Sequence, residues 1–155
     1  MRDIKPVLLV EDDKVDAMTT ERAFRDLKVV NTLTHRINGE DALAYLRDPE
    51  TDCPCVILLD INMPKMNGLE FLEEVKRDEA LKHIPVVMLT TSKKEFDINE
   101  SFLLSAAGYI VKPVDYQKFV DAIRILDLYW TLSETPGIEK GIPYGETETA
   151  SFSGR

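Results

Sequence analysis

The chain has 155 residues, and its 28 acidic and 19 basic residues leave a formal net charge of −9. This length suits one domain, and a hydrophobic fraction of 44% can form a core that buries about 70% of the unfolded surface. The acidic balance argues against nucleic acid or an anionic membrane as a partner, because both attract clustered Lys and Arg. No apolar run approaches the ~18 residues of a membrane span, and the charged N-terminus lacks a signal-peptide pattern. We therefore expect a cytoplasmic protein.

The first part of the chain predicts strands and helices in alternation. Val7–Val10 is wholly apolar, as buried parallel strands are. Asp13 then caps a helix, whose modest apolar stripe is Ala17, Thr20, Phe24 and Leu27. A β-rich run at Thr32–Ile37 predicts a weaker strand that closes at the turn signal Asn38-Gly39. A short helix follows and must end near Pro49; it carries Ala42, Leu43 and Leu46.

The alternation continues through three further strands and three helices. The apolar run Val56–Leu59 precedes a helix marked by Leu69, Leu72 and Val75. The next strand, Val86–Leu89, precedes a helix that ends near Gly108 and whose predicted core face is Ile98, Phe102, Leu103 and Ala106. The strand Tyr109–Val111 leads to the clearest helix, Tyr116–Trp130, which Asp115 caps and whose stripe is Phe119, Ile123, Leu126 and Trp130.

Five alternations of strand and helix predict an α/β fold with a parallel sheet and helices on both faces. After Leu132 the composition changes to Gly, Pro and polar residues without apolar periodicity. We therefore interpret residues 1–132 as the folded domain and 133–155 as a mobile tail. No second domain is apparent, so we expect no DNA-binding output domain.

The two cysteines, Cys53 and Cys55, flank Pro54 and are too close in sequence for an unstrained disulfide. The two histidines, His35 and His83, are distant in sequence from both thiols. A zinc site is therefore not expected, and we predict two reduced thiols.

Polar residues stand where four of the predicted strands end. The ligand site of an open α/β sheet lies beyond the carboxyl ends of its strands, so these residues should meet in one crevice: Glu11, Asp12, Asp60, Thr90 and Lys112. Carboxylates at 4 Å repel by roughly 4 kcal/mol per pair at an effective dielectric constant of 20, so a cation must lie between them. Oxygen ligands without Cys or His favour Mg²⁺. A carboxylate nucleophile, a hydroxyl, an ammonium and Mg²⁺ together indicate phosphoryl transfer, with Asp60 the best-placed nucleophile.

Four blocks of the sequence resemble the receiver domain of bacterial two-component response regulators. The phosphoacceptor segment is Leu58–Gly68, and the other blocks are Glu11-Asp12, Pro85–Thr90 and Tyr109–Pro113. The resemblance covers Lys5 to about Leu132. It implies a flavodoxin-like, doubly wound sheet of five parallel strands in the order 2-1-3-4-5 with five helices, so that residues 1–132 form a receiver domain.

The resemblance also implies roles for single residues. Asp60 would accept a phosphoryl group from the phosphohistidine of a histidine kinase, and Thr90 and Lys112 would hold the phosphoryl oxygens. Mg²⁺ would be bound by Asp12, Asp60 and the backbone carbonyl of Asn62, with Glu11 acting through water. Tyr109 would be the switch aromatic together with Thr90, and Lys112-Pro113 would carry a cis peptide bond. Thr91 departs from the family, in which a smaller residue commonly follows the switch Thr.

Within the family, three features resemble the small regulators paired with phytochrome-type histidine kinases. They are the run Thr90-Thr91-Ser92, the block from Tyr109 to Asp115, and the pair Tyr129-Trp130. We expect a homodimer through the fourth helix, the fifth strand and the fifth helix, with Tyr129 and Trp130 as aromatic anchors. Trp130 also lies on the predicted core stripe, so a role in closing the core is the alternative for this residue.

The function expected from the sequence is a phosphorylation-controlled binding switch, not a turnover enzyme, although such a switch assists its own phosphotransfer and dephosphorylation. A phosphatase of the haloacid dehalogenase type would need an acid/base Asp two residues after the nucleophile, where this chain has Asn62. A receiver that serves only as a scaffold is the other alternative, and the intact set of acidic residues, Thr90 and Lys112 argues against it.

Overall fold

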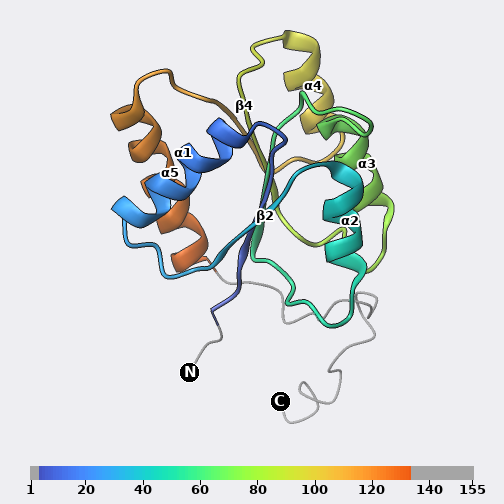
Figure 1. Cartoon of the computed structure of the whole chain (residues 1–155). Coiled ribbons are helices and arrows are strands. Elements are labelled where there is room, and N and C mark those ends of the chain that lie inside the picture. Colours follow the sequence, from blue (N-terminus) through green and yellow to red (C-terminus); the bar gives the residue numbers. More distant parts are fainter. Residues whose placement is uncertain (1–3, 134–155) are drawn as a thin grey trace, which may run out of the picture.

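The computed structural model describes residues 4–133 and has five parallel strands in the order β2-β1-β3-β4-β5 (Figure 1). The predicted doubly wound fold is thereby confirmed. The strands are β1 (Val7–Val10), β2 (Leu33–Arg36), β3 (Val56–Leu59), β4 (Val86–Thr90) and β5 (Gly108–Val111). The helices are α1 (Lys14–Asp26), α2 (Gly39–Arg47), α3 (Gly68–Arg77), α4 (Glu95–Leu103) and α5 (Tyr116–Leu132). The predicted tail, 133–155, lies outside the described residues apart from Ser133.

The three central strands are buried throughout, whereas the edge strands β2 and β5 are half-buried. Alternate side chains of a strand point to opposite faces, so each central strand contributes to two cores. Leu8, Ile57 and Leu59 join the core on the side of α2 and α3. Val7, Val56 and Leu58 join the core on the side of α1 and α5. Figure 1 shows these two helix pairs on opposite sides of the sheet.

Four of the five helices begin at a side chain that accepts a hydrogen bond from the backbone of the first turn. The predicted caps Asp13 and Asp115 accept from the backbone N–H of Asp16 and Lys118, each at 3.0 Å. Asn38 caps α2, and Asn67 forms a capping box with Glu70. Each cap satisfies backbone donors that the helix leaves free, and Asp13 and Asp115 begin the two helices that they were predicted to cap.

Helix α4 does not follow the predicted pattern. The expected core face included Phe102 and Leu103, but both side chains are exposed, and the buried residues of this helix are Asp97 and Ser101. Its N-cap residue, Lys94, makes no side-chain cap. Of the predicted face, Ala106 is buried but lies beyond the end of the helix. The physical reason is that hydrogen bonds from Ser92 and Ser101 satisfy the inward-facing polar groups, so apolar periodicity does not set the orientation of this helix.

Trp130 belongs to the core and is not an exposed anchor as the dimer prediction required. Its side chain is 6% exposed, and its ring lies 6.0 Å from that of Phe24. Its indole N–H donates to Asn31 Oδ1 at 3.1 Å, which satisfies the one polar atom of the buried ring. Its neighbour Tyr129 is 56% exposed. The alternative role of Trp130, closing the core, is therefore the correct one.

Two further expectations concern the cysteines and the length of the helices. Cys53 and Cys55 are unbridged thiols, and burial raises the pKa of Cys55 to about 11. None of the helices between residues 4 and 133 has the length and apolar character that a bilayer crossing requires.

The adjacent pair Trp130 and Tyr129 provides a test of the core on the α5 side. We expect Trp130→Ala to lower the free energy of unfolding by about 3–5 kcal/mol, because it removes a buried ring and leaves a cavity. Tyr129→Ala, the matched control, should change it by no more than about 0.5 kcal/mol, as is usual for exposed residues. Urea unfolding followed by circular dichroism measures both. Equal losses for the two variants would place the indole outside the core.

Candidate functional site

The carboxyl ends of four strands bring the predicted site residues to one edge of the sheet. Glu11 and Asp12 follow β1, Asp60 follows β3, Thr90 ends β4, and Lys112 follows β5. The parallel register aligns these ends, since Val10 pairs with Leu59 and Thr90 pairs with Val111. Residues 90 and 112 are also joined directly, because the backbone N–H of Lys112 donates to the carbonyl of Thr90 at 2.8 Å.

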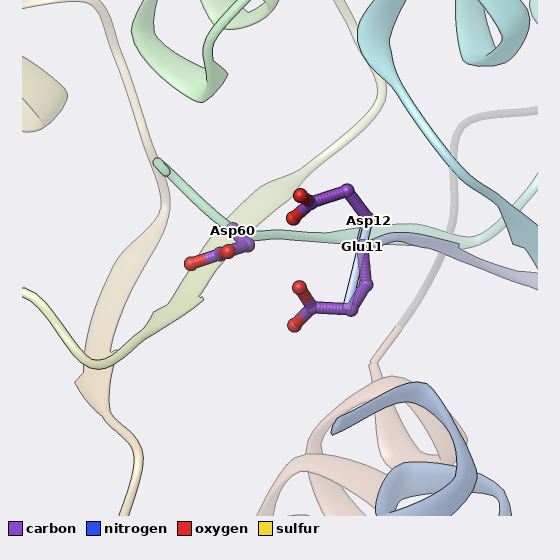
Figure 2. A group of neighbouring side chains, drawn as sticks. All are labelled: Glu11, Asp12 and Asp60. Atoms are coloured by element: carbon purple, nitrogen blue, oxygen red, sulfur yellow. The ribbon is translucent and has the colours of Figure 1, made fainter. Parts of the chain in front are cut away.

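Three carboxylates form a cluster at this edge. One oxygen from each of Glu11, Asp12 and Asp60 lies within 4.8 Å of the others. Figure 2 shows Glu11 and Asp12 extending from the same strand end on the side of Asp60. Glu11 is 1% exposed and Asp60 7% exposed, whereas Asp12 lies in solvent.

A divalent cation fits this donor set. Two oxygens bound to one Mg²⁺ at about 2.1 Å can be at most about 4.2 Å apart, so small side-chain movements would bring all three carboxylates to one ion. The ligands are hard oxygens without nitrogen or sulfur, which favours Mg²⁺ or Mn²⁺. Because Asp12 is exposed, an ion and its water ligands can reach the cluster from the solvent.

Burial of Glu11 has a marked electrostatic effect. Desolvation raises the pKa of this carboxyl to about 7, against the opposing influence of a hydrogen bond and ion pair from Lys112. The negative charge of Asp60 raises this pKa further. The site thus holds carboxylates that repel one another in a poorly solvated position, where a cation stabilises their ionised form.

Lys112 supplies the one positive charge that contacts the cluster among the described residues. Its ammonium donates to Glu11 and, at 3.2 Å, to Asp16 of α1. The Lys112 side chain is only 10% exposed. Although desolvation lowers its pKa, the carboxylates Glu11, Asp60 and Asp16 raise it above the ordinary value, so this lysine stays charged.

Asp16 is a member of the site that sequence reasoning missed. It lies in the first turn of α1, four residues after Asp12, where an acidic residue is usually read as favourable to the helix dipole. Its spacing from Asp12 could have identified it, because the first turn of a helix that directly follows β1 lies beside the carboxyl end of that strand. No family motif marked this position.

The loop after Asp60 is held by a close backbone approach at Gly68. A Cβ atom at this position would lie 2.2 Å from the carbonyl oxygen of Asp60 and 2.7 Å from the Cα of Ile61. The backbone N–H of Gly68 donates to the carbonyl of Ile61 at 2.9 Å. Ile61 and Met63 are buried, whereas Asn62 between them is exposed next to the site. Glycine is therefore required where α3 begins.

Thr90 and Tyr109 are linked through Ser92. Thr90 is fully buried, and its Oγ1 accepts from the backbone N–H of Ser92 at 3.2 Å. The Tyr109 hydroxyl donates to the backbone carbonyl of Ser92 at 3.0 Å. Desolvation is the largest cause that raises the pKa of Tyr109. The two predicted switch residues thus both contact Ser92: Thr90 its backbone N–H, and Tyr109 its backbone carbonyl.

The expected cis peptide bond is absent. Residues 4–133 contain no cis peptide, so Lys112–Pro113 is trans. A bond before proline favours trans by about 0.5–1 kcal/mol, and only surrounding contacts can reverse that preference. Here Pro113 is half-buried and Val114 fully exposed, so the packing around the bond does not impose the cis form.

The role of Asp12 can be tested by metal titration. We expect Asp12→Ala to abolish Mg²⁺ binding without loss of the fold, because the side chain is exposed and its removal relieves repulsion within the cluster. Asp13→Asn removes the same charge one residue further on and keeps an N-cap, so it should bind Mg²⁺ almost as the wild type does. Isothermal titration calorimetry measures both. Unchanged binding in Asp12→Ala would exclude Asp12 as a metal ligand.

Known proteins are similar to this chain in sequence and fold. FilR2 of Methanothrix harundinacea, a probable methanogenesis regulatory protein, is 35% identical over 127 residues, which cover 80% of this chain and 82% of FilR2. Response regulator Rcp1 of Synechocystis sp. is 33% identical over 130 residues, which cover 81% of this chain and 88% of Rcp1. The Mn²⁺-bound form of Rcp1 superposes with a TM-score of 0.78 at 32% identity, covering 85% of this chain and 99% of Rcp1. The phosphorylated cyanobacterial phytochrome response regulator RcpA superposes with a TM-score of 0.81 at 34% identity, covering 86% of this chain and 99% of RcpA.

The family itself is defined by the match of residues 7–124 to the response regulator receiver domain. This range contains all five strands and the whole of the acidic cluster. Family membership also favours a signalling switch over a phosphatase of the haloacid dehalogenase type, because the receiver family consists of signalling switches. The chain therefore belongs to the response-regulator receiver family and is a phosphoacceptor of two-component signalling.

Proposed function

We propose that Asp60 is the residue that accepts the phosphoryl group, from the phosphohistidine of a sensor histidine kinase. One observation carries this assignment: the Asp60 carboxylate is buried at the end of β3, within a cluster of oxygens that can hold a divalent cation. The Mg²⁺ ion would be held by Asp12, Asp60 and the backbone carbonyl of Asn62, and Glu11 would act on it through a water molecule. When bound, the ion neutralises the charge that develops on the phosphoryl oxygens.

The transfer can be written with this chain's own residues. A carboxylate oxygen of Asp60 attacks phosphorus, and the P–N bond to the kinase imidazole breaks as the new O–P bond forms. The electron pair of the broken bond stays on the imidazole nitrogen, and because the other ring nitrogen of the phosphohistidine is protonated, the leaving group is neutral imidazole. The hydroxyl of Thr90 and the ammonium of Lys112 hold the phosphoryl oxygens as charge shifts toward Asp60.

Two groups must move for this to happen. The Lys112 ammonium is bound to Glu11 and Asp16, so it has to turn toward the phosphoryl group on Asp60. Thr90 Oγ1 accepts from Ser92, and its hydroxyl has to reorient in the same direction. Both movements would couple phosphorylation to the surroundings of the site.

The side of α1 and β5 is suited to the approach of a kinase. A pocket beside Lys112 is lined by residues of α1 and of the segment that leads into α5, among them Asp16, Arg22, Pro113 and Tyr116. Val15 and Met18 of α1 are exposed, as is Val114. RcpA is a phytochrome response regulator, and its similarity in sequence and fold supports a phytochrome-type histidine kinase as the partner.

The chain also assists its own dephosphorylation, which requires a water aligned with the O–P bond. Asn62 is exposed two residues after Asp60 and offers an amide that can orient such a water. In the described structure the Ser92 hydroxyl donates to Asp97 at 2.6 Å. Neither side chain is a base, so we expect hydrolysis to be slow to intermediate, with Asn62 the more influential residue.

The phosphoacceptor can be identified with acetyl phosphate as donor. We expect Mg²⁺-dependent labelling of the wild type, and at least a tenfold loss in Asp60→Asn, because an amide is a poor nucleophile. Asp41→Asn is the control, since Asp41 is an exposed acidic residue in the first turn of α2, outside the cluster. Phosphoprotein gels or mass spectrometry measure the labelled fraction. Undiminished labelling of Asp60→Asn would place the acceptor elsewhere.

We propose that the output of this switch is a homodimer whose interface includes α5. Trp130 cannot be an anchor, but a second apolar stripe of α5 is exposed and steps by three, one and three residues: Ile125, Leu128, Tyr129 and Leu132. Exposed apolar side chains of α4, Phe96, Phe102 and Leu103, lie on the neighbouring element of the expected surface. Aromatic and aliphatic residues of this kind are common at interface centres.

Sedimentation with and without beryllofluoride and Mg²⁺ tests the dimer. We expect the phosphoryl analogue to tighten dimerisation modestly, since the shift is limited by its differential affinity for the two states. Tyr129→Glu should weaken the dimer, because it places a charge in an apolar contact. Arg124→Ala, also on α5 and exposed, is the control and should leave the dimer unchanged. Monomeric behaviour of the wild type in both conditions would eliminate the dimer and leave a monomeric switch.

A further inference from the structure

Helix α4 is attached to the domain by polar contacts. Asp97 is 8% exposed and Ser101 is fully buried, and these are its buried residues. Phe96 and Leu103, the large apolar residues near its ends, are 69% and 79% exposed. Burial of an apolar stripe fixes most amphipathic helices. Each of the other four helices buries at least one large apolar side chain: Phe24 in α1, Leu46 in α2, Phe71 in α3 and Ile123 in α5. For α4 this contribution is small, so hydrogen bonds must hold its position.

The principal polar contact of α4 is made with Ser92, in the loop that follows β4. The Ser92 hydroxyl donates to Asp97 Oδ2 at 2.6 Å, and both side chains are buried. A hydrogen bond to a carboxylate is stronger than a neutral one. No ion pair found between residues 4 and 133 involves Asp97, so Ser92 is the partner through which this buried carboxylate is tied to the loop.

Ser92 also contacts both residues of the proposed switch. Its backbone N–H donates to Thr90 Oγ1, and its backbone carbonyl accepts from the Tyr109 hydroxyl. Its side chain additionally accepts from the backbone N–H of Lys94 at 3.3 Å, next to the start of α4. One residue therefore joins the hydroxyl that would bind the phosphoryl group, the switch tyrosine and the helix.

We propose that the buried hydrogen bond between Ser92 and Asp97 is a latch that holds α4 in its resting position and opposes the phosphorylated state. The inference rests on the proposed phosphorylation of Asp60. When Thr90 turns its hydroxyl toward the phosphoryl group, the Ser92 backbone loses its acceptor, and rotation of Tyr109 removes a second contact. The loop then moves away from the position in which Ser92 meets Asp97. Asp97 is thus a positioning residue whose contact belongs to the resting state.

A contact made only in the resting state has a definite thermodynamic consequence. Removing it shifts the equilibrium toward the active state and tightens the binding of any ligand that prefers that state. Beryllofluoride with Mg²⁺ is such a ligand, because it mimics the phosphoryl group on the acceptor. We expect Asp97→Ala to tighten beryllofluoride binding by about three- to tenfold. Asp97→Asn keeps an acceptor oxygen for Ser92 without the charge, and its affinity should lie between those of Asp97→Ala and the wild type.

Ser101→Ala is the matched control. The Ser101 hydroxyl is buried in the same helix and donates to the backbone carbonyl of Asp97, but among the described residues it makes no hydrogen bond to the loop that holds Ser92. Its removal therefore perturbs α4 without opening the latch, and we expect beryllofluoride affinity within twofold of the wild type. Calorimetric titration in the presence of Mg²⁺ gives the affinities of all four proteins, and urea unfolding confirms that each is folded.

Amide hydrogen exchange provides a readout that does not depend on the phosphoryl analogue. In Asp97→Ala we expect faster exchange confined to residues 92–103, and no such change in Ser101→Ala. Wild-type affinity in Asp97→Ala, or equal exchange in the two variants, would overturn the latch. Failure of the wild type to bind beryllofluoride would instead overturn the proposed phosphorylation of Asp60, while the exchange comparison would still decide whether Asp97 holds α4. Should Asp97→Ala not fold, the Asp97→Asn variant carries the same comparisons.

Discussion

The arrangement of this protein depends on carboxylates that are held at the ends of buried strands. Glu11 and Asp60 follow runs of apolar residues that are almost completely excluded from solvent, and they share one crevice with Asp12. Such charges are unfavourable unless cations accompany them. Lys112 provides one positive charge from the far side of β4, and a divalent ion can provide the rest. The repulsion favours the binding of a cation by this cluster, and a bound cation would in turn favour the arrival of an anionic phosphoryl group.

Much of the fold and of the site could be predicted because the relevant signals are local. Apolar runs such as Val7–Val10 and Val56–Leu59 gave strands at the expected residues, and Asp13 and Asp115 begin the helices that they were expected to cap. The site residues at the strand ends followed from topology, because parallel strands place their carboxyl ends at one edge. The family's motifs added the individual roles, including the switch pair Thr90 and Tyr109, and these roles stay predictions.

The errors arose where hydrogen bonds and individual side-chain contacts, not apolar spacing, decide the outcome. The orientation of α4 depends on hydrogen bonds from Ser92 to Asp97, and apolar spacing at Phe102 and Leu103 carries no information about them. Trp130 could have been an anchor or a core residue from its spacing alone, and its contacts with Phe24 and Asn31 decide the matter. Asp16 was missed because its partner Lys112 lies at the other end of the sequence. In each case the deciding interaction is a contact that apolar periodicity does not indicate, either between neighbouring polar residues, as at Ser92 and Asp97, or between segments far apart in sequence.

The close approach of Gly68 to the backbone of Asp60 gives the domain an asymmetry. Because no side chain fits between them, the start of α3 packs directly on the backbone that follows β3, and Ile61 and Met63 of the connecting loop are buried. Helix α3 also carries Phe71, Leu72 and Val75 into the core beside α2. This half of the molecule therefore packs tightly against Asp60. The proposed phosphorylation of Asp60 would accordingly displace the loops after β4 and β5 more readily than the start of α3.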